Sequence, residues 1–208
     1  MSGSKKDGIS VLSMNCRGLA NPQKRRDVFQ FLRQKSFSIY MLQDTHFDPK
    51  LEDCIRAEWG YKAYFASFNT ASRGVAILFN NNFEFEIKKI YKDIDGNFII
   101  VYIKTVDTDL LIVNLYGPND DDLEFYVQLE ELITDLDVDN VIIGGDWNLV
   151  IDFSLDYDNY KHYNNPKAQE QVHKMIQNLD LNDIWRDINP ERRRYTWRRS
   201  NPVQQSRL

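Results

Sequence analysis

Short apolar runs separated by polar residues recur along the first part of the chain. The runs at residues 9–14 and 38–43 have the length and apolar content of buried strands. Further β-like runs follow in the middle of the chain, at residues 61–68, 74–79, 83–91, 98–104 and 110–115. No helical pattern interrupts this series, so the middle of the chain is predicted to consist of consecutive strands.

Helical spacing of apolar residues predicts helices elsewhere in the chain. Asn21 and Pro22 supply an N-cap and a first-turn proline for one helix. Residues 120–136 combine an acidic first turn with apolar residues at helical spacing, and residues 167–179 form a further amphipathic pattern. Between these two helices, residues 141–143 form a short apolar strand.

This order of elements predicts an α+β fold in which two β-sheets lie face to face with helices on the outside. A doubly wound parallel sheet is the alternative, which the run of strands without helices between residues 61 and 115 disfavours. Residues 1–8 are small and polar and are expected to form a flexible tail. Residues 9–208 are expected to form one domain, since 208 residues lie below the length at which chains usually split.

Composition narrows the class of protein. The net charge of −5 gives no general attraction to a polyanion, so any nucleic-acid binding must come from a local basic face. Cys16 and Cys54 lack the spacing of a disulfide framework, and the N-terminus lacks the apolar core of a signal peptide. We therefore expect a soluble cytoplasmic and nuclear protein without a membrane partner, because no apolar run approaches the roughly 20 residues of a membrane-spanning helix.

Polar residues directly after apolar strands are the candidate site residues, because strand ends hold side chains rigidly at the rim of a sheet. They are Asn15, Gln43 with Asp44, Asn114 through Asn119, and Asp146-Trp147-Asn148. Any one of them alone is more often a turn former or a cap than a ligand. Together they offer oxygen and amide groups without a Cys–His cluster, which favours a hard cation such as Mg²⁺ over zinc.

Five ordered motifs extend this pattern over most of the chain. They are Ser13-Met14-Asn15-Cys16-Arg17-Gly18-Leu19, Leu42-Gln43-Asp44-Thr45-His46, Arg73-Gly74-Val75-Ala76-Ile77-Leu78, Asn114-Leu115-Tyr116-Gly117-Pro118-Asn119 and Gly144-Gly145-Asp146-Trp147-Asn148. The set resembles the endonuclease domain of LINE-type non-LTR retrotransposons, a branch of the endonuclease/exonuclease/phosphatase superfamily related to apurinic/apyrimidinic endonucleases. The resemblance implies a four-layered α/β sandwich with two mainly antiparallel sheets, in agreement with the strand pattern.

The resemblance also implies roles for residues that match its motifs. Asn15 corresponds to an Asn near the metal and phosphate, and Asp44 occupies the place of a metal-binding Glu. Tyr116 corresponds to an active-site Tyr whose hydroxyl contacts the scissile phosphate. Asp146 is expected to orient or deprotonate the attacking water, and Asn148 to hydrogen-bond the phosphoryl oxygens. The implied cofactor is Mg²⁺, with Mn²⁺ as the alternative ion.

Asp44 departs from the family's pattern, because aspartate is one methylene shorter than glutamate. Mg²⁺ requires near-octahedral ligands at about 2.0–2.1 Å. Direct binding by Asp44 therefore requires a shift of the ion, and otherwise a water molecule must bridge them. Reduced metal affinity or rate is the resulting hypothesis.

DNA contacts are expected from Arg73, Asn119 and Thr196, which match positions on the DNA face of relatives. A basic cluster near Thr196 offers a local patch on an otherwise acidic chain. Its members are Arg192, Arg193, Arg194, Arg198, Arg199 and Arg207, of which Arg198 and Arg207 are taken as DNA contacts. A solvated charged loop is the alternative explanation. The three histidines, His46, His162 and His173, do not match the family's catalytic histidine and are assigned structural or surface roles.

Relatives continue with an Asp directly after the segment that matches Ser206-Arg207-Leu208, and with a Ser-Asp-His motif further on. We expect the domain to be incomplete at its C-terminus, without its last strands. Since those strands lie inside the sandwich in relatives, an exposed sheet edge and marginal stability are expected for the chain as given.

The function implied by the resemblance is Mg²⁺-dependent nicking of double-stranded DNA for retrotransposon integration, which leaves a 3′-hydroxyl and a 5′-phosphate. A monomer is expected, linked in the parent protein to a reverse transcriptase domain. Two alternatives remain open. The chain could be a catalytically inactive fragment with at most weak DNA binding, or a phosphatase or phosphodiesterase of the same superfamily.

Overall fold

The computed structural model describes residues 8–159 and 165–207. Apart from Gly8, the predicted N-terminal tail lies outside these residues, as does His162. The chain divides into two compact units. Unit 1 comprises Met1–Tyr116 and Ile142–Asp146, and unit 2 comprises Gly117–Val141 and Trp147–Leu208.

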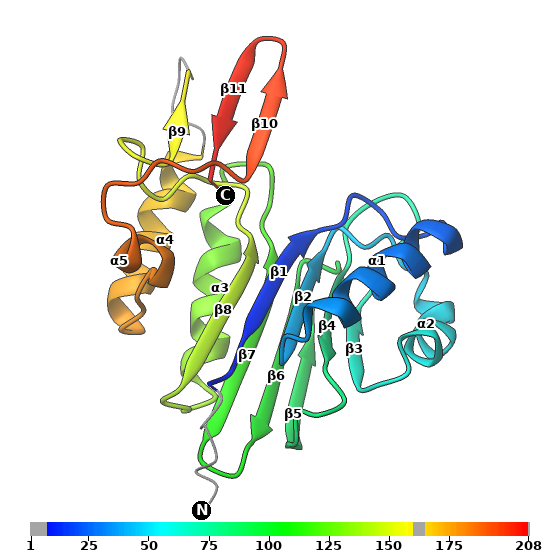
Figure 1. Cartoon of the computed structure of the whole chain (residues 1–208). Helices are drawn as coiled ribbons and strands as arrows, with labels where there is room; N and C mark the ends of the chain where they lie inside the picture. Colours follow the sequence, from blue (N-terminus) through cyan, green and yellow to red (C-terminus); the bar gives the residue numbers. More distant parts are fainter. Residues whose placement is uncertain (1–7, 160–164, 208) are drawn as a thin grey trace, which may run out of the picture. The chain divides into compact units, whose positions relative to one another are not determined.

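The first sheet of unit 1 has the strand order β1-β2-β4-β3 (Figure 1). Its strands are β1 (Val11–Asn15), β2 (Ile39–Gln43), β3 (Ala63–Ala66) and β4 (Val75–Phe79). β1 and β2 are parallel, whereas β2–β4 and β3–β4 are antiparallel. The parallel pair places the carboxyl ends of β1 and β2 at the same edge of the sheet.

The second sheet of unit 1 has the order β5-β6-β7-β8 (Figure 1). Its strands are β5 (Glu86–Lys92), β6 (Phe98–Lys104), β7 (Asp109–Tyr116) and β8 (Val141–Asp146). The β5–β6 and β6–β7 pairs are antiparallel, with a register shift between Ile87 and Lys89. The run of consecutive strands predicted for the middle of the chain is thus confirmed.

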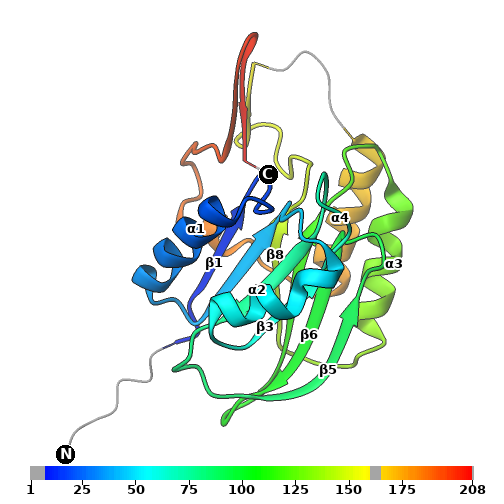
Figure 2. The same cartoon turned by 90° about the vertical axis from the view of Figure 1, so that its right-hand side faces the viewer.

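Two apolar layers hold unit 1 together, and strand alternation assigns each side chain to one of them. Tyr40 and Leu42 of β2 pack on the side of the helices α1 (Pro22–Lys35) and α2 (Glu52–Trp59). Ile39 and Met41 pack on the other side, with residues of the second sheet. The two sheets therefore lie face to face, and Figure 2 looks onto α1 and α2 over the first sheet. The predicted α+β class is confirmed, and the doubly wound alternative is wrong.

Local sequence accounts for the position of α1. The Asn21 side chain accepts hydrogen bonds from the backbone N–H groups of Gln23 and Lys24, and Pro22 occupies the first turn. Phe29 and Leu32 lie on the buried face, where each contributes about 1.5–3 kcal/mol through burial. The predicted cap and helix are confirmed.

Unit 2 contains the helices α3 (Leu123–Thr134), α4 (Pro166–Asn178) and α5 (Ile184–Ile188). Its small sheet has the order β10-β11-β9, from β9 (Tyr157–Asp158), β10 (Trp197–Ser200) and β11 (Val203–Ser206). The core of this unit is formed by Tyr126, Leu149, Ala168 and Val172. The helices predicted at 120–136 and 167–179 are confirmed as α3 and α4.

The sequence pattern missed several short elements. These are α2, the preceding 3₁₀ turn (Pro49–Leu51), α5 and β9 to β11. α2 and α5 span 8 and 5 residues, so each offers too few turns for a periodic apolar pattern to stand out. No helix within the described ranges combines the length and apolar character needed to cross a membrane.

Candidate active site

The carboxyl ends of β1 and β2 continue into loops that stay hydrogen-bonded to each other. Asn15 pairs in register with Gln43. Beyond them, the Cys16 N–H donates to Gln43 O over 2.8 Å and the Gly18 N–H donates to Asp44 O over 2.7 Å. The backbone that carries Asn15 and Asp44 is therefore fixed on both sides.

Asn15 and Asp146 are in direct contact within unit 1. Asn15 Nδ2 donates to Asp146 Oδ2 over 2.8 Å, while Asn15 Oδ1 accepts from the backbone N–H of Arg17 over 2.9 Å. Because both Nδ2 and Oδ1 of its amide are hydrogen-bonded, the Asn15 side chain has a defined χ2 angle. It therefore orients the Asp146 carboxylate.

Close backbone packing places Asp146 beside the end of β7. Gly145 has φ +151°, and a Cβ built on it would lie 2.1 Å from Leu115 O. At Gly144, a Cβ would lie 2.6 Å from the Met41 sulfur. Glycine at both positions permits this approach, and it brings Asp146 and the half-buried Tyr116 to adjacent strand ends.

Asp44 contacts His46, to which the sequence assigns only a structural or surface role. His46 Nε2 lies 2.8 Å from Asp44 Oδ1, and the two side chains are 21% and 17% exposed. Both residues have positive φ values, +54° for Asp44 and +56° for His46. The structural role predicted for His46 is therefore a specific one, a hydrogen bond to the Asp44 carboxylate.

A buried amide cluster lies beneath this edge of unit 1. Asn114 is fully buried, and its Nδ2 donates to Leu42 O over 2.9 Å and to Ala76 O over 2.8 Å. Its Oδ1 accepts from Gln43 Nε2 over 2.7 Å. The Asn114 side chain thus connects β7 to β2 and β4 of the facing sheet. This connection gives Asn114 a structural role.

Asn148, in unit 2, is held by its own side chain. Its Nδ2 donates to Gly117 O over 2.7 Å, which fixes the amide plane. A Cβ on Gly117 would lie 2.3 Å from Trp147 O, so only glycine permits this packing. Asn165 Nδ2 donates to Asn148 O over 3.2 Å and to Asn119 O over 3.4 Å, connecting the loops that carry both predicted site residues.

Arg73 lies in a loop of unit 1, immediately before β4. Its guanidinium lies 5.0 Å from the Phe68 ring centroid and 4.0 Å from an Asp95 carboxylate oxygen. Its backbone carbonyl accepts from the His46 N–H over 2.9 Å. The Arg73 loop is thereby connected to the loop that carries Asp44.

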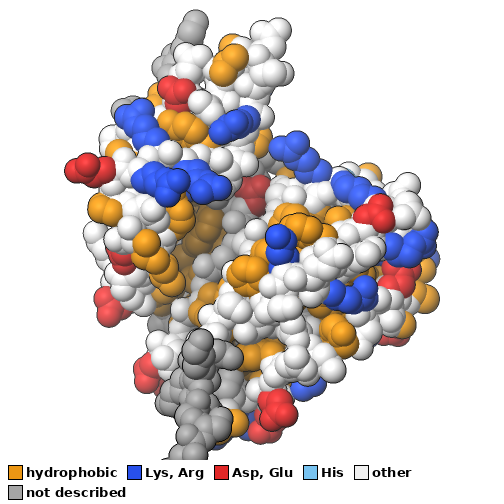
Figure 3. All heavy atoms as spheres, viewed as in Figure 1, with side chains coloured by type: hydrophobic (Ala, Val, Ile, Leu, Met, Phe, Trp, Pro, Cys, Tyr) orange, Lys and Arg blue, Asp and Glu red, His pale blue; other side chains and the backbone are white. Residues whose placement is uncertain are grey.

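The β10–β11 hairpin carries two predicted DNA contacts. The Thr196 N–H donates to Ser206 O over 2.9 Å at the base of the hairpin, and Arg198 is exposed on β10. Figure 3 shows Lys and Arg side chains gathered beside the hairpin. Exposed members of the basic cluster are Arg192, Arg193, Arg194, Arg198 and Arg199.

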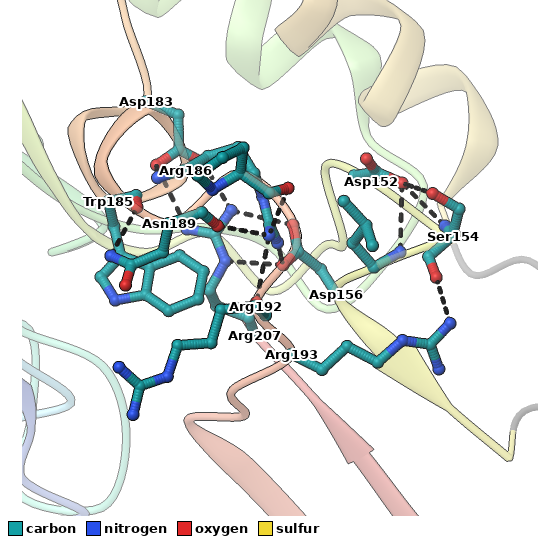
Figure 4. Close-up of polar contacts among 12 residues, drawn as sticks. Asp152, Ser154, Asp156, Asp183, Trp185, Arg186, Asn189, Arg192, Arg193 and Arg207 are labelled. Carbon is teal, nitrogen blue, oxygen red and sulfur yellow. Dashed lines mark hydrogen bonds and ion pairs between the residues drawn. The ribbon is translucent and has the colours of Figure 1, made fainter.

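Arg207 differs from the other arginines of the cluster because two carboxylates engage its guanidinium. It donates to Asp156 through Nε and Nη2, each over 2.8 Å, and to Asp183 through Nη2 over 2.5 Å. Arg186 donates to the same Asp156, which is 1% exposed, and Trp185 lies beside both arginines (Figure 4). The DNA-contact role of Arg207 stays a prediction, and these bonds give it a structural role.

Ion pairing in this network shifts the pKa values of its members. Burial of Asp183 opposes its ionisation, but hydrogen bonds from Arg207 and the Arg186 backbone outweigh burial and hold the pKa of the Asp183 carboxyl below its ordinary value. Burial would lower the pKa of Arg207, but its bonds to Asp156 and Asp183 raise it. Asp183 and Arg207 are therefore both charged at neutral pH.

The donor groups at the candidate site have the chemistry of a magnesium site. Asn15, Asp44 and Asp146 offer oxygens and no thiolate, and Mg²⁺ is commonly held by one or two carboxylates together with water. Across the described residues, no cluster of three or more His, Cys, Asp or Glu side chains could hold a metal ion. The residues fit a hard cation that keeps most of its hydration shell, and they do not fit a closed structural metal site.

The chain is similar to known proteins over most of its length. The sequence profile of the Endonuclease/Exonuclease/phosphatase family matches residues 12–208. A Xenopus laevis protein described as the Transposon TX1 uncharacterized 149 kDa protein is 29% identical over 209 residues, which cover 96% of this chain. The match covers 15% of the Xenopus protein, so the chain spans a small part of that relative's length.

Solved structures share the fold. An AP endonuclease from Leishmania major superposes with a TM-score of 0.78 at 14% identity, over 92% of this chain and 73% of that chain. A 3′ phosphatase from Neisseria, solved bound to product DNA hairpin, gives a TM-score of 0.75 at 16% identity, over 96% of this chain and 87% of that chain. At these identities the likeness establishes the fold alone.

Proposed function

Because the chain belongs to the endonuclease/exonuclease/phosphatase family, we propose that it is a metal-dependent DNA endonuclease domain that nicks target DNA for retrotransposon integration. The transposon-encoded relative supports the integration role and agrees with the LINE-type resemblance of the motifs. The observation that carries the proposal is the hydrogen bond from Asn15 to Asp146, which connects two motif residues at the rim of the sheets.

The attacking water is the group that Asp146 activates. Its carboxylate accepts from Asn15 Nδ2 through Oδ2. A carboxylate held in this way can orient a water molecule for in-line attack on phosphorus and accept its proton. Cleavage leaves a 3′-hydroxyl and a 5′-phosphate, and the 3′-hydroxyl can prime reverse transcription.

Asn148 and Tyr116 act on the phosphate. The Asn148 amide carries two hydrogens, and the bond to Gly117 O fixes the plane in which both lie. A preoriented amide donor stabilises charge that builds on the phosphoryl oxygens without further reorganisation. Tyr116, at the end of β7, supplies a hydroxyl for the scissile phosphate.

Asp44 and Asn15 are the proposed ligands for the divalent cation, which is Mg²⁺ or Mn²⁺. When bound, such a cation neutralises charge on the phosphate in the transition state. The backbone that carries Asp44 and Asn15 is held because the loops after β1 and β2 are hydrogen-bonded to each other.

Double-stranded DNA is the proposed partner, and its proposed contacts are basic and polar side chains of the hairpin, of the loop before β4 and of the loop after β7. The proposed contacts are Arg73, Asn119, Thr196 and Arg198, with Arg207 as a support of the hairpin base. Since the chain spans a small part of its transposon relative, we propose that it acts as a monomeric domain of a longer protein with a reverse transcriptase. We propose a cytoplasmic and nuclear location for the protein, which agrees with DNA as its substrate.

Plasmid nicking tests the proposal. The purified chain is incubated with supercoiled plasmid and Mg²⁺, alongside EDTA and Asp146→Ala controls. Conversion to open circles that both controls abolish supports the proposal. A soluble, folded chain that yields no open circles, alone or after substitution of Mn²⁺ for Mg²⁺, overturns the proposed activity and supports the inactive-fragment alternative.

A second candidate function is removal of phosphate from DNA 3′ ends, the activity named for the Neisseria 3′ phosphatase that shares this fold. An end-labelled duplex with a 3′-phosphate distinguishes the two activities. Release of inorganic phosphate without internal cleavage supports the phosphatase, whereas internal nicks with no phosphate release support the endonuclease.

A further inference from the structure

We propose that His46 is a positioning residue that fixes the Asp44 carboxylate for the divalent cation, and this inference rests on the proposed function. His46 Nε2 and Asp44 Oδ1 lie 2.8 Å apart. An ionised carboxylate can only accept a hydrogen bond, so the Nε2 hydrogen is the donor. This hydrogen bond fixes Asp44 Oδ1. It thereby also sets the direction in which the second carboxylate oxygen, Oδ2, points.

Asp44 needs such a partner because its carboxylate is attached through one methylene group. A shorter side chain places its oxygens closer to the backbone, where a small rotation moves them off the line to an ion that tolerates little distortion. Asp44 also has φ +54°, in the left-handed region, which sets its side-chain direction. A hydrogen bond from His46 removes the remaining rotational freedom.

His46 is held in place on several sides. A Cβ on Gly18 would lie 2.7 Å from His46 Nδ1, so the Gly18 backbone packs against the Nδ1 edge of the ring. The His46 N–H donates to Arg73 O over 2.9 Å. The His46 side chain is 21% exposed. The ring is therefore held among protein atoms and does not meet Asp44 as a freely solvated side chain would.

Backbone conformation gives independent support. Positive φ values are uncommon for residues other than glycine. Ten such residues occur in the described part of the chain, and four of them, Arg17, Asp44, His46 and Arg73, lie around the ends of β1 and β2 and the start of β4. Such conformations cost about 1–3 kcal/mol each and cluster where function requires a fixed geometry. The turn from Asp44 to His46 brings the two side chains into contact through a backbone path that a regular strand does not follow.

Removal of the hydrogen bond should weaken cation binding without unfolding the chain. Groups that orient a metal ligand typically contribute 10–100-fold to metal affinity. His46→Gln keeps an N–H donor at the distance of Nε2, whereas His46→Asn keeps an amide that is one methylene too short to reach. The amide nitrogen of Gln donates as the imidazole N–H does but cannot bind a metal ion, so a loss of affinity in this variant indicates coordination by the imidazole.

The experiment measures Mn²⁺ affinity from the free-ion electron paramagnetic resonance signal, and Mg²⁺ affinity by competition, on the full chain. The variants are His46→Gln, His46→Asn and His46→Ala, with thermal melts to establish that each is folded. His173→Asn, at an exposed histidine of α4, is the matched control. We expect His46→Asn and His46→Ala to weaken both ions about 10–100-fold, and His46→Gln to stay within about 3-fold of wild type.

Each other outcome is informative. Folded His46→Asn and His46→Ala chains that bind both ions as tightly as wild type overturn the inference. Loss of Mn²⁺ affinity in His46→Gln, with Mg²⁺ affinity retained, also overturns it, because this pattern indicates direct coordination by the imidazole. If wild type binds neither ion, or Asp44→Ala binds as well as wild type, the proposed metal site itself fails.

Discussion

Asn15 Nδ2 lies 2.8 Å from Asp146 Oδ2, although the two residues are 131 positions apart in the chain. Asn15 ends β1 of the first sheet, and Asp146 ends β8 of the second. The bond therefore joins the rims of two facing sheets at the point where the proposed water-activating group lies. The proposed catalytic geometry therefore depends on how the two sheets are stacked.

Asn15→Ala should lower the nicking rate because Asp146 loses its orienting donor and the cation loses a proposed ligand. Substitution of a supporting residue of this kind costs about 10–100-fold in activity. Since Asn15 is partly exposed, the melting temperature should change little. Steady-state kinetics on plasmid DNA, with the exposed turn residue Asn81→Ala as the control, measures the effect. An unchanged kcat in Asn15→Ala would show that Asp146 needs no such support.

Gly145→Ala should destabilise the chain strongly. The added Cβ would lie 2.1 Å from Leu115 O at a φ of +151°. A loss of about 3 kcal/mol is expected, which lowers the melting temperature by roughly 6–12 °C for a chain of this size. Gly60→Ala is the matched control, because Gly60 has φ +84° with nothing within 4 Å of its Cβ. Backbone strain alone should cost about 1–2 kcal/mol at Gly60. Equal losses of stability in the two variants would therefore contradict a steric clash at Gly145.

The strand-end motifs could be predicted from the sequence because the pattern is local. Apolar runs predicted the strands, and Asn15, Asp44 and Asp146 stand at or just beyond the ends of those strands. That Asn15 contacts Asp146 could not be derived from the chain alone, since this contact depends on sheet stacking. The resemblance to a known family supplied the grouping of these residues.

Two features escaped the sequence for different physical reasons. The Asp44–His46 contact depends on two positive φ values, which aspartate and histidine adopt too rarely for the sequence to locate them. Arg207 belonged to a basic cluster by sequence, but its carboxylate partners Asp156 and Asp183 lie 51 and 24 positions away. A charge count along the chain cannot distinguish an exposed arginine from one that carboxylates neutralise.

Asn114→Asp should be among the most destabilising single substitutions in unit 1. It replaces the two hydrogens donated to Leu42 O and Ala76 O by a charged acceptor in a fully buried place. A loss of about 3–5 kcal/mol at neutral pH is expected. Burial raises the pKa of the introduced carboxyl, so stability should recover partly as the pH falls and the group becomes neutral.

Denaturant melts of Asn114→Asp at pH 5 and pH 8 measure this dependence, with Asn114→Ala as the uncharged comparison. Asn114→Ala should be less stable than wild type by a similar amount at both pH values. If the two variants respond identically to pH, the introduced carboxyl is solvated, and Asn114 is not the buried connection between β7 and the facing sheet.

Asp183→Asn should remove part of the acid sensitivity of unit 2. The folded-state pKa of Asp183 lies below its ordinary value of 3.8. Its contribution to stability is therefore present above about pH 4 and is lost as the pH falls through the folded-state pKa. The substitution preserves the helix cap, because an amide oxygen can still accept the Arg186 N–H bond that begins α5.

Thermal melts from pH 2.5 to pH 7 follow this effect. Wild type should melt higher than Asp183→Asn at neutral pH, and the difference should shrink toward zero at the acid end. Asp187→Asn, at an exposed position of α5, serves as the control and should show little difference throughout. If the difference in melting temperature between wild type and Asp183→Asn grows as the pH falls, the pKa of Asp183 is not lowered in the folded state.

The two cysteines should differ in reactivity. Cys16 is buried, its thiol donates to Met14 O over 3.5 Å, and burial is the main cause that raises its pKa to about 12. Because the thiolate is the reactive species, Cys16 should resist modification in the native chain, whereas the exposed Cys54 should react quickly.

An aromatic disulfide reagent at pH 8 checks this difference. Cys54→Ser should abolish the fast reaction, Cys16→Ser should leave it intact, and both thiols should react in denaturant. A fast second thiol in the native chain contradicts the burial of Cys16. Since Cys16 directly follows Asn15 and its N–H is bonded to Gln43 O, its slow reaction in Cys54→Ser measures how often the loop beside the candidate site opens.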